Sequence, residues 1–208
     1  MPTLTIFAGI NGAGKSTLYN FIKHSKDYDL GIRICPDEIL QDFNGDWEDQ
    51  THQIKSGLLA LKQIRFCLKN NKSFNWETTI IGTTALKIIK QAKQQGYTVN
   101  LNFIGVQNVE QSLERIKKRV DEGGHGINDK VVKQRYNRQF DNLQEVCGLA
   151  NNVIFYDNTK TMCIVGTYSN KSLLLFGDQP WVSELEVLKN THGQLVHFKL
   201  SNLFKENK

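Results

Sequence analysis

The 208-residue sequence has no long apolar run. No segment approaches the roughly 18 consecutive apolar residues that a membrane-spanning helix needs. The first residues also lack the basic and then apolar pattern of a secretory signal peptide. Internal repeats and low-complexity segments are missing too. We therefore expect a cytoplasmic chain that does not interact with a membrane.

Cysteine is scarce and scattered. No two cysteines have the spacing of a CxxC pair, and no histidine stands at metal-ligand spacing from them. This pattern predicts reduced thiols in a cytosolic protein, and it argues against a disulfide framework or a zinc site. The four cysteines are Cys35, Cys67, Cys147 and Cys163.

The chain carries little excess charge. Its 26 lysines and arginines against 21 aspartates and glutamates leave a net charge of +5. Such a surplus reflects either a soluble surface slightly rich in lysine or an attraction to phosphorylated ligands. It does not predict a nucleic-acid partner, because a nucleic-acid motor would carry a larger basic surface and a further domain. With 39% hydrophobic and 23% charged residues, the chain has the composition of one sizeable folded domain.

Short apolar runs alternate with helical periodicities from residue 3 to residue 158, which predicts an α/β fold with a mostly parallel sheet. The expected strands lie in 3–9, 31–38, 73–79, 97–106 and 151–158, and Pro36 stops the second of them. The expected helices are 15–25, 50–71, 84–96, 108–124 and 128–150, with Gly96 as the C-cap of the third and Asn128 or Asp129 as the N-cap of the last.

The alternation of expected strands and helices ends after Asn158. We expect residues 161–208 to add a β-hairpin, turned at Ser169 and Asn170, and a short helix that begins near Pro180. This addition would pack on the domain formed by residues 1–160. The tail 201–208 should be frayed.

Residues 9–16, GINGAGKS, match the phosphate-binding pattern GxxxxGK[ST] in full. Glycines let such a loop curl so that successive N–H groups surround phosphate oxygens. Lys15 supplies a charge for the terminal phosphates, and Ser16 supplies a hydroxyl ligand for Mg²⁺. An apolar strand precedes the loop and an amphipathic helix follows it. The pattern predicts binding of ATP or GTP with magnesium.

Acidic residues follow three of the expected strands. In open α/β sheets the ligand lies at the carboxyl ends of the strands, where Asp37, Glu77 and Asp157 would all stand. Phosphoryl transfer to a hydroxyl needs an acid that accepts the hydroxyl proton, and Asp37 is placed for it. Glu77 would orient substrate or a magnesium-bound water. Alternatively, Asp37 only caps a helix, and the strand VIFYD ending at Asp157 is a Walker B strand.

Residues 114–140 predict a helical lid. Its two helical pieces flank a loop in which Gly123 and Gly124 would act as a hinge. Arginine forks suit the charge that develops on equatorial oxygens during phosphoryl transfer. The alternative is a pair of solvated helices rich in lysine. The arginines at helical spacing are Arg115 with Arg119 and Arg135 with Arg138.

These motifs resemble the zeta toxin family of kinase-like ATPases. The resemblance covers residues 3 to about 160 and rests on AGINGAGKST, PDEI at 36–39, WETT at 76–79, RVDEGGH at 119–125, RYNR at 135–138 and YDN at 156–158. It implies a P-loop kinase fold, a nucleotide sugar such as UDP-N-acetylglucosamine as acceptor, and an antitoxin as a partner. Two residues depart from the family pattern on the substrate side: Cys35 replaces an asparagine, and Asn128 replaces a proline.

The resemblance also assigns roles by position. Lys15 becomes the phosphate-binding lysine, Asp37 the catalytic base and Glu77 a substrate-binding acid. Arg119 and Arg135 would contact the γ-phosphate. The expected catalytic residues are Asp37, Lys15, Arg119 and Arg135. The expected nucleotide-binding residues are Gly9, Asn11, Gly12, Ala13, Gly14, Lys15, Ser16, Thr17, Asp157 and Asn158. The expected substrate-binding residues are Glu77, Thr78, His125 and Arg138, with Ser16 on the metal.

We therefore expect a P-loop NTPase of the kinase-like type, folded as a three-layer α/β sandwich with a helical lid and a C-terminal hairpin addition. Its function would be transfer of the γ-phosphate of Mg-ATP to a hydroxyl. The main alternative is an ATPase or switch without a small-molecule acceptor. A nucleotide or shikimate-type kinase is a closer rival, since it shares the donor site and differs only in the acceptor pocket.

Overall fold

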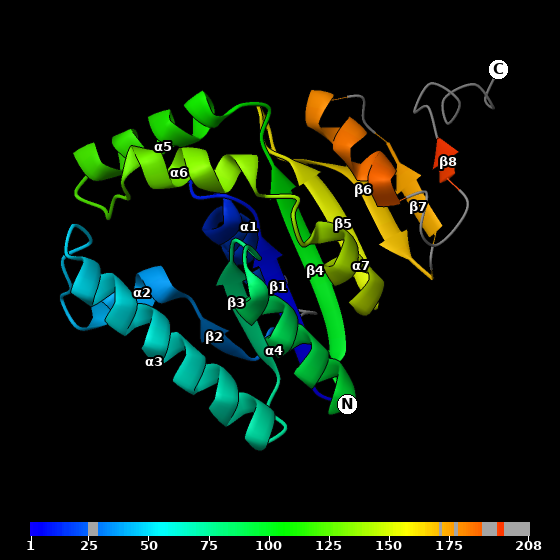
Figure 1. The fold of residues 1–208 in the computed structure, drawn as a ribbon, viewed down its shortest axis with the longest axis horizontal. Coiled ribbons are helices and arrows are strands. Elements are labelled where there is room, and N and C mark those ends of the chain that lie inside the picture. Colours follow the sequence, from blue (N-terminus) through cyan, green and yellow to red (C-terminus); the bar gives the residue numbers. More distant parts are fainter. Residues whose placement is uncertain (25–28, 171, 177–178, 189–194, 198–208) are drawn as a thin grey trace.

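A single sheet of eight strands organises the described part of the chain, which in this computed structural model comprises residues 1–24, 29–170, 172–176, 179–188 and 195–197. The strands lie in the order β2-β3-β1-β4-β5-β6-β7-β8 (Figure 1). They are β1 (Thr3–Ala8), β2 (Ile32–Ile34), β3 (Phe74–Thr78), β4 (Thr98–Gly105), β5 (Asn152–Asp157), β6 (Cys163–Ser169), β7 (Ser172–Leu175) and β8 (Leu195–His197).

The five strands β2, β3, β1, β4 and β5 are parallel to one another. Their carboxyl ends therefore lie along one edge of the sheet, where the connecting loops and ligands of such folds are found. The remaining strands extend the sheet on the other side: β6 is antiparallel to β5, β7 is antiparallel to β6, and β8 is parallel to β7.

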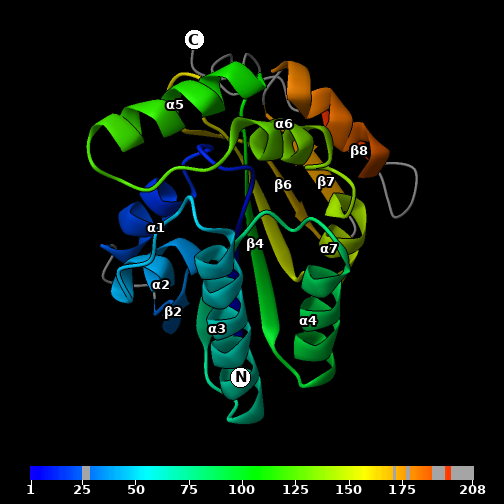
Figure 2. The same cartoon turned by 60° about the vertical axis from the view of Figure 1, so that its left-hand side comes forward.

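Helices cover both faces of the sheet and make three layers (Figures 1 and 2). On one face a large apolar cluster joins the sheet to α3, α4, α7 and the 3₁₀ helix η1, and on the other a smaller cluster joins it to α1. The α/β sandwich is confirmed. The helices are α1 (Lys15–Lys23), α2 (Pro36–Asp42), α3 (Gln50–Lys69), α4 (Thr83–Gln94), α5 (Val109–Asp121), α6 (Asp129–Asn137), α7 (Leu143–Leu149) and η1 (Pro180–Leu188).

The predicted helix 128–150 is wrong as a single element, because it forms two helices, α6 and α7. Asn142 explains the break. Its side-chain amide donates to the carbonyl oxygens of Ile80 and Gly82 at 2.7 and 2.8 Å, so it ties the connection to the end of β3. Asn128 caps the first piece by accepting a hydrogen bond from the N–H of Lys130.

Within residues 31–38 the strand stops before Pro36, as predicted, but Asp37 and Glu38 lie in a helix and not at the strand end. β2 ends at Ile34, and α2 begins at Pro36. Proline suits the first position of a helix because its missing N–H has no intrahelical partner there. Asp37 and Glu38 in the first turn favour the positive end of the helix dipole. This start places Asp37 one residue into a helix, at the carboxyl edge of the sheet.

The C-terminal addition continues the main sheet. β6 and β7 form the predicted hairpin, with Asn170 at φ 49° in its turn, and a helical element begins at Pro180 as expected. Its form is 3₁₀, and strand β8 was not predicted. The tail 201–208, predicted to be frayed, lies outside the described residues. Among the helices that the structure describes, none is long and apolar enough to cross a membrane.

Candidate active site

The glycine-rich loop between β1 and α1 is held close to its neighbours. Gly9 has φ 140°, and a Cβ there would lie 2.3 Å from the carbonyl oxygen of Ile104. Gly14 has φ 102°, and a Cβ there would lie 2.4 Å from the side-chain nitrogen of Asn158. Only glycine fits both positions, since side chains rarely adopt this backbone conformation. The loop therefore keeps the curled form that a phosphate cradle needs.

Lys15 opens α1 and points into the loop. It is 8% exposed, and its Nζ donates a hydrogen bond to the carbonyl oxygen of Ile10 at 2.9 Å. Burial lowers the pKa of Lys15, against the opposing charges of Glu77 and Asp37. The lysine is therefore a buried cation at the mouth of the loop, flanked by two carboxylates.

Glu77 lies next to the loop because β3 is the neighbour of β1 in the sheet, with Phe7 opposite Glu77. The Ser16 hydroxyl donates to both carboxylate oxygens of Glu77, at 3.0 and 3.2 Å. A serine hydroxyl and a carboxylate are the oxygen ligands that Mg²⁺ prefers. Ser16 and Glu77 are therefore residues that could hold such an ion.

Arg33 on β2 holds Glu77 from the other side. Its guanidinium pairs with Glu77, and it also pairs with Glu38 at 2.8 Å and donates to Asn75 Oδ1 at 3.2 Å. It lies 3.8 Å from the ring centre of Tyr19. Burial alone would lower the pKa of Arg33, but Glu38 and Glu77 raise it above its usual value. We did not predict Arg33; its signal was a cation three residues before Pro36 of the PDE segment.

Asp37 faces His125 of the loop between α5 and α6. His125 Nε2 lies 2.7 Å from Asp37 Oδ2, and its Nδ1 lies 3.2 Å from the Gln41 amide nitrogen. With a proton on Nε2, the imidazole donates a hydrogen bond to the Asp37 carboxylate. Burial alone would raise the pKa of Asp37, but the hydrogen bond and charge of His125, together with Lys15, hold it below its usual value.

The arginines of α5 and α6 reach the loop in three different ways. Arg115 donates to the carbonyl oxygen of Asn158 at 2.7 Å and to that of Gly12 at 3.4 Å. Arg135 donates to Asn11 Oδ1 at 2.8 Å, and burial lowers its pKa against the charge of Asp37. Two buried guanidinium nitrogens of Arg119, Nε and Nη2, have no hydrogen-bond partner within the described chain. Unpaired buried donors of a cation suit an anionic ligand.

The structure places two of the expected site residues away from the phosphate loop. Arg138 is 57% exposed and pairs with Asp141 at 2.9 Å. Asp157 lies on β5, and its Oδ1 accepts hydrogen bonds from Trp181 and Thr159, both at 2.7 Å. Its neighbour Asn158 does reach the loop, where its side-chain amide donates to the Ala13 carbonyl oxygen at 2.8 Å.

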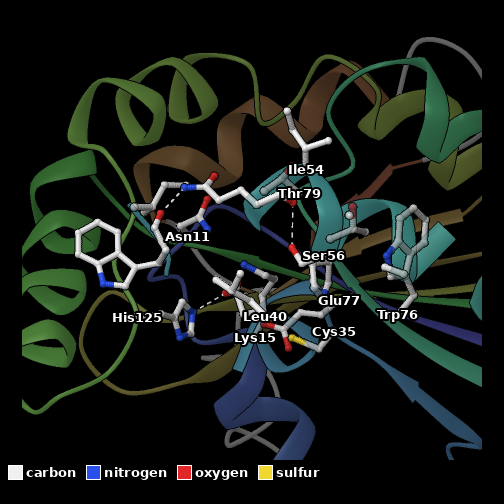
Figure 3. A pocket seen from close by; sticks show the side chains of 18 of the residues that line it. Asn11, Lys15, Cys35, Leu40, Ile54, Ser56, Trp76, Glu77, Thr79 and His125 are labelled. Carbon is white, nitrogen blue, oxygen red and sulfur yellow. Dashed lines mark hydrogen bonds and ion pairs between the residues drawn. The ribbon is translucent and has the colours of Figure 1, made fainter. Parts of the chain in front are cut away.

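Two cavities meet at these groups. The first, which we term the P-loop cavity, has about 460 Å³ and lies under α5; the second, the α3 cavity, has about 470 Å³ and lies between α3 and β3 (Figure 3). The P-loop cavity is lined by Gly12, Gly14, Ser16, Thr17, Arg115, Arg119 and Asn158, among others. The α3 cavity is lined by Thr78, His125 and Arg135, among others. Both are lined by Asn11, Lys15, Asp37 and Glu77.

The fold and the loop define a class: a P-loop protein of the kinase-like type, in which the strand beside β1 carries an acid next to the loop serine. The family model described as Zeta toxin matches residues 1–167. The chain therefore belongs to the zeta toxin family, as the motifs predicted.

Relatives and solved structures agree with this assignment. A protein of Haemophilus influenzae is 37% identical over 130 residues, which cover 62% of this chain and 89% of the relative. The structure of the PezAT chromosomal toxin-antitoxin system of Streptococcus pneumoniae is similar in fold, with a TM-score of 0.60 at 15% identity over 93% of this chain and 80% of that one. So is the structure of AvrRxo1-ORF1:-ORF2 with ATP, with a TM-score of 0.59 at 17% identity over 80% of this chain and 58% of that chain.

Proposed function

We propose that the protein is a kinase that transfers the γ-phosphate of Mg-ATP, or of Mg-GTP, to a hydroxyl group of a small molecule. The observation that carries the proposal is the meeting of two cavities at Lys15 and Asp37. The P-loop cavity is lined by the phosphate loop, whereas the α3 cavity is lined mainly by side chains from outside that loop. An ATPase without an acceptor would have no need of the second cavity.

In this proposal the P-loop cavity takes the nucleotide. Backbone N–H groups of the loop and Lys15 hold the β- and γ-phosphates. Arg119 and Arg135 neutralise charge that develops on the transferred group. Asn158 and the residues beside it lie toward the nucleobase of the nucleotide. The Thr17 hydroxyl and Gly12 complete the donor side.

Ser16 and Glu77 are the residues that would hold magnesium. Their oxygens already lie within hydrogen-bond distance, and Arg33 fixes the orientation of Glu77. When bound, the ion would supply positive charge against the β- and γ-phosphate oxygens. Glu77 also lines the α3 cavity, so it would contact the acceptor as well, together with Thr78 and His125.

Asp37 is the base of the proposed reaction. As the acceptor oxygen bonds to the γ-phosphorus, the bond from that phosphorus to the β-γ bridging oxygen breaks, the acceptor proton passes to the Asp37 carboxylate, and ADP leaves. The depressed pKa of Asp37 keeps the carboxylate ionised at neutral pH. The family resemblance implies UDP-N-acetylglucosamine as the acceptor. PezAT is a toxin-antitoxin system and AvrRxo1-ORF1:-ORF2 also has two components, which makes an antitoxin partner part of the proposal.

The test is Asp37→Asn assayed with γ-labelled ATP and a panel of UDP-sugars, nucleosides and small alcohols. Transfer should fall on the order of 10³-fold, because a positioned base contributes about 10²–10⁴, while ATP affinity stays near that of the unaltered protein. Glu48→Gln, an exposed change on the α2–α3 connection, is the control. Undiminished transfer in Asp37→Asn would refute the assignment of the base. ATP hydrolysis without transfer to any acceptor would favour a switch.

A further inference from the structure

The α3 cavity is charged at one end only. Six of its lining residues can ionise. Burial raises the pKa of the Cys35 thiol to about 12, so this group is neutral. The other five form one connected group at the P-loop, through the contacts of Arg135 with Asn11 and of His125 with Asp37. They are Lys15, Asp37, Glu77, His125 and Arg135.

The remainder of the cavity has no charged side chain. Ile54 and Leu58, one helical turn apart on α3, are 56% and 62% exposed although they line the cavity. Gln53 and Thr79 add an amide and a hydroxyl, which can hydrogen-bond a neutral polar group. Figure 3 shows Ile54, Leu40 and Trp76 among the side chains around this space. The rest of this wall comprises Trp47, Ser56, Gly57, Ala60, Leu61, Ile64 and Ile127.

Nothing on this wall could neutralise a second phosphorylated group. The N-terminus of α3, which could bind an anion, is capped by Asp49, whose carboxylate accepts from the N–H of Thr51 at 2.7 Å. The first turn of α2 carries Asp37 and Glu38. Lys55 of α3 lies against the ring of Phe43, 4.4 Å from its centre, and does not line the cavity.

We propose that the acceptor is an uncharged alcohol with an aromatic or hydrocarbon portion, and that it carries no phosphate of its own. A phosphate placed against this wall would lose part of its hydration without a cation to replace it, which is costly. An apolar portion would instead cover Ile54 and Leu58, and its hydroxyl would lie toward Asp37. The inference rests on the proposed function and departs from the nucleotide sugar that the family resemblance implies.

Matched pairs of acceptors test the inference with the full chain. Uridine is compared with UMP, pyridoxine with its 5′-phosphate, and N-acetylglucosamine with UDP-N-acetylglucosamine, each with γ-labelled ATP and Mg²⁺. The 5′-O-methyl ethers of uridine and pyridoxine, which are uncharged but lack the hydroxyl that the phosphate replaces, serve as controls. In every pair that reacts, kcat/KM should be at least about tenfold higher for the uncharged member. Pyridoxine and uridine, which have rings that can pack on the apolar wall, should exceed N-acetylglucosamine. A higher kcat/KM for the phosphorylated members overturns the inference and leaves the proposed kinase activity intact.

Binding measurements test the inference even if no member of the panel is phosphorylated. Such a lack of phosphorylation would count against the proposed function but not against the inference. Dissociation constants are measured by calorimetry in the presence of ADP and Mg²⁺. Tighter binding by the uncharged members supports the inference. Tighter binding by the phosphorylated members overturns it, as does absence of binding by every uncharged member up to about 10 mM, above the usual range of KM.

Two arginine substitutions on α3 provide a control for position. Leu58→Arg places a cation on the apolar wall and should weaken the binding of uridine or pyridoxine at least about tenfold. It should also reduce the difference in affinity between each of these compounds and its phosphorylated partner. Phe66→Arg is the same type of change at a 56% exposed position of the same helix that lines neither cavity, and it should leave both affinities unchanged. Equal effects of the two variants would overturn the inference.

Discussion

At the scale of single residues, the site depends on pairs of charges that come from distant parts of the chain. Asp37 meets His125, 88 residues away, and Glu77 meets Arg33, 44 residues away. Each acid also lines both cavities. The ionisation of the proposed base and the orientation of the proposed metal ligand therefore depend on partners outside their own sequence motifs.

His125 predicts a pH effect. A carboxylate accepts a proton only when ionised, so activity is lost as pH falls through the pKa of Asp37. In His125→Ala the hydrogen bond and charge that lower this pKa are gone while burial, which raises it, remains. The acid limb of kcat/KM should therefore move to higher pH. Profiles from about pH 3 to about pH 8 measure this limb, with His24→Ala, at an exposed position, as the control. An unmoved limb in His125→Ala would contradict the role of His125.

Arg33 predicts a stability effect. Arg33→Leu leaves the carboxylate of Glu77, which is 7% exposed, without its cation, and should lower the free energy of unfolding by about 3 kcal/mol. Arg33→Leu combined with Glu77→Gln should recover much of the loss, because the unpaired charge is removed as well. Urea unfolding of the two single variants and the double variant gives the coupling. Strictly additive losses would mean that the pair does not interact.

At the scale of elements, local sequence explains most boundaries. Proline with two acids starts α2, Asn128 caps α6, and Gly96 follows the last turn of α4. The break between α6 and α7 has a different cause. It depends on Asn142 reaching carbonyl groups 60 and 62 residues away, and helical periodicity carries no signal of that contact.

Two glycines offer a matched test of backbone conformation. A Cβ at Gly57 within α3 or at Gly96 after α4 would meet no atom within 4 Å, yet only Gly96 has a positive φ, 78°. Gly57→Ala should therefore raise the free energy of unfolding by about 0.5–1 kcal/mol through helix propensity. Gly96→Ala should lower it by about 1–2 kcal/mol, because an L-residue is strained there. Urea unfolding measures both changes in the free energy of unfolding. Changes of the same sign would contradict the difference in backbone conformation between Gly57 and Gly96.

At the scale of the whole molecule, the C-terminal addition is joined to the site-bearing sheet. Trp181 of η1 stacks on Phe140, with ring planes 13° apart, and packs against Gly105 at the end of β4. Its Nε1–H donates to the buried carboxylate of Asp157. Asp157 in turn holds Thr159, whose carbonyl oxygen Arg115 contacts. A chain of contacts thus runs from the addition to α5.

Trp181→Phe tests this connection. It keeps an aromatic ring in the core but leaves the Asp157 carboxylate one donor short, which should cost about 1–3 kcal/mol of unfolding free energy. Trp181→Phe with Asp157→Asn should lose less than the sum, since an amide is cheaper to bury than a charge. Trp47→Phe, at a half-buried position between α2 and α3, should cost less. Equal losses in the two single tryptophan variants would argue against a special role for the Trp181–Asp157 contact.

The sequence by itself determined the phosphate loop, the alternating parallel fold and the residues Lys15, Asp37 and Glu77, because glycine spacing and apolar periodicity are local properties of the chain. Only the tertiary structure decided which strand lies beside the loop. That neighbour is β3, so the acid touching Ser16 is Glu77, whereas Asp157 lies two strands from β1 and faces Trp181. Strand order, the Arg33 and His125 pairings and the one-sided charge of the α3 cavity all arise from contacts between distant segments, and such contacts leave no periodic trace in the residues that make them.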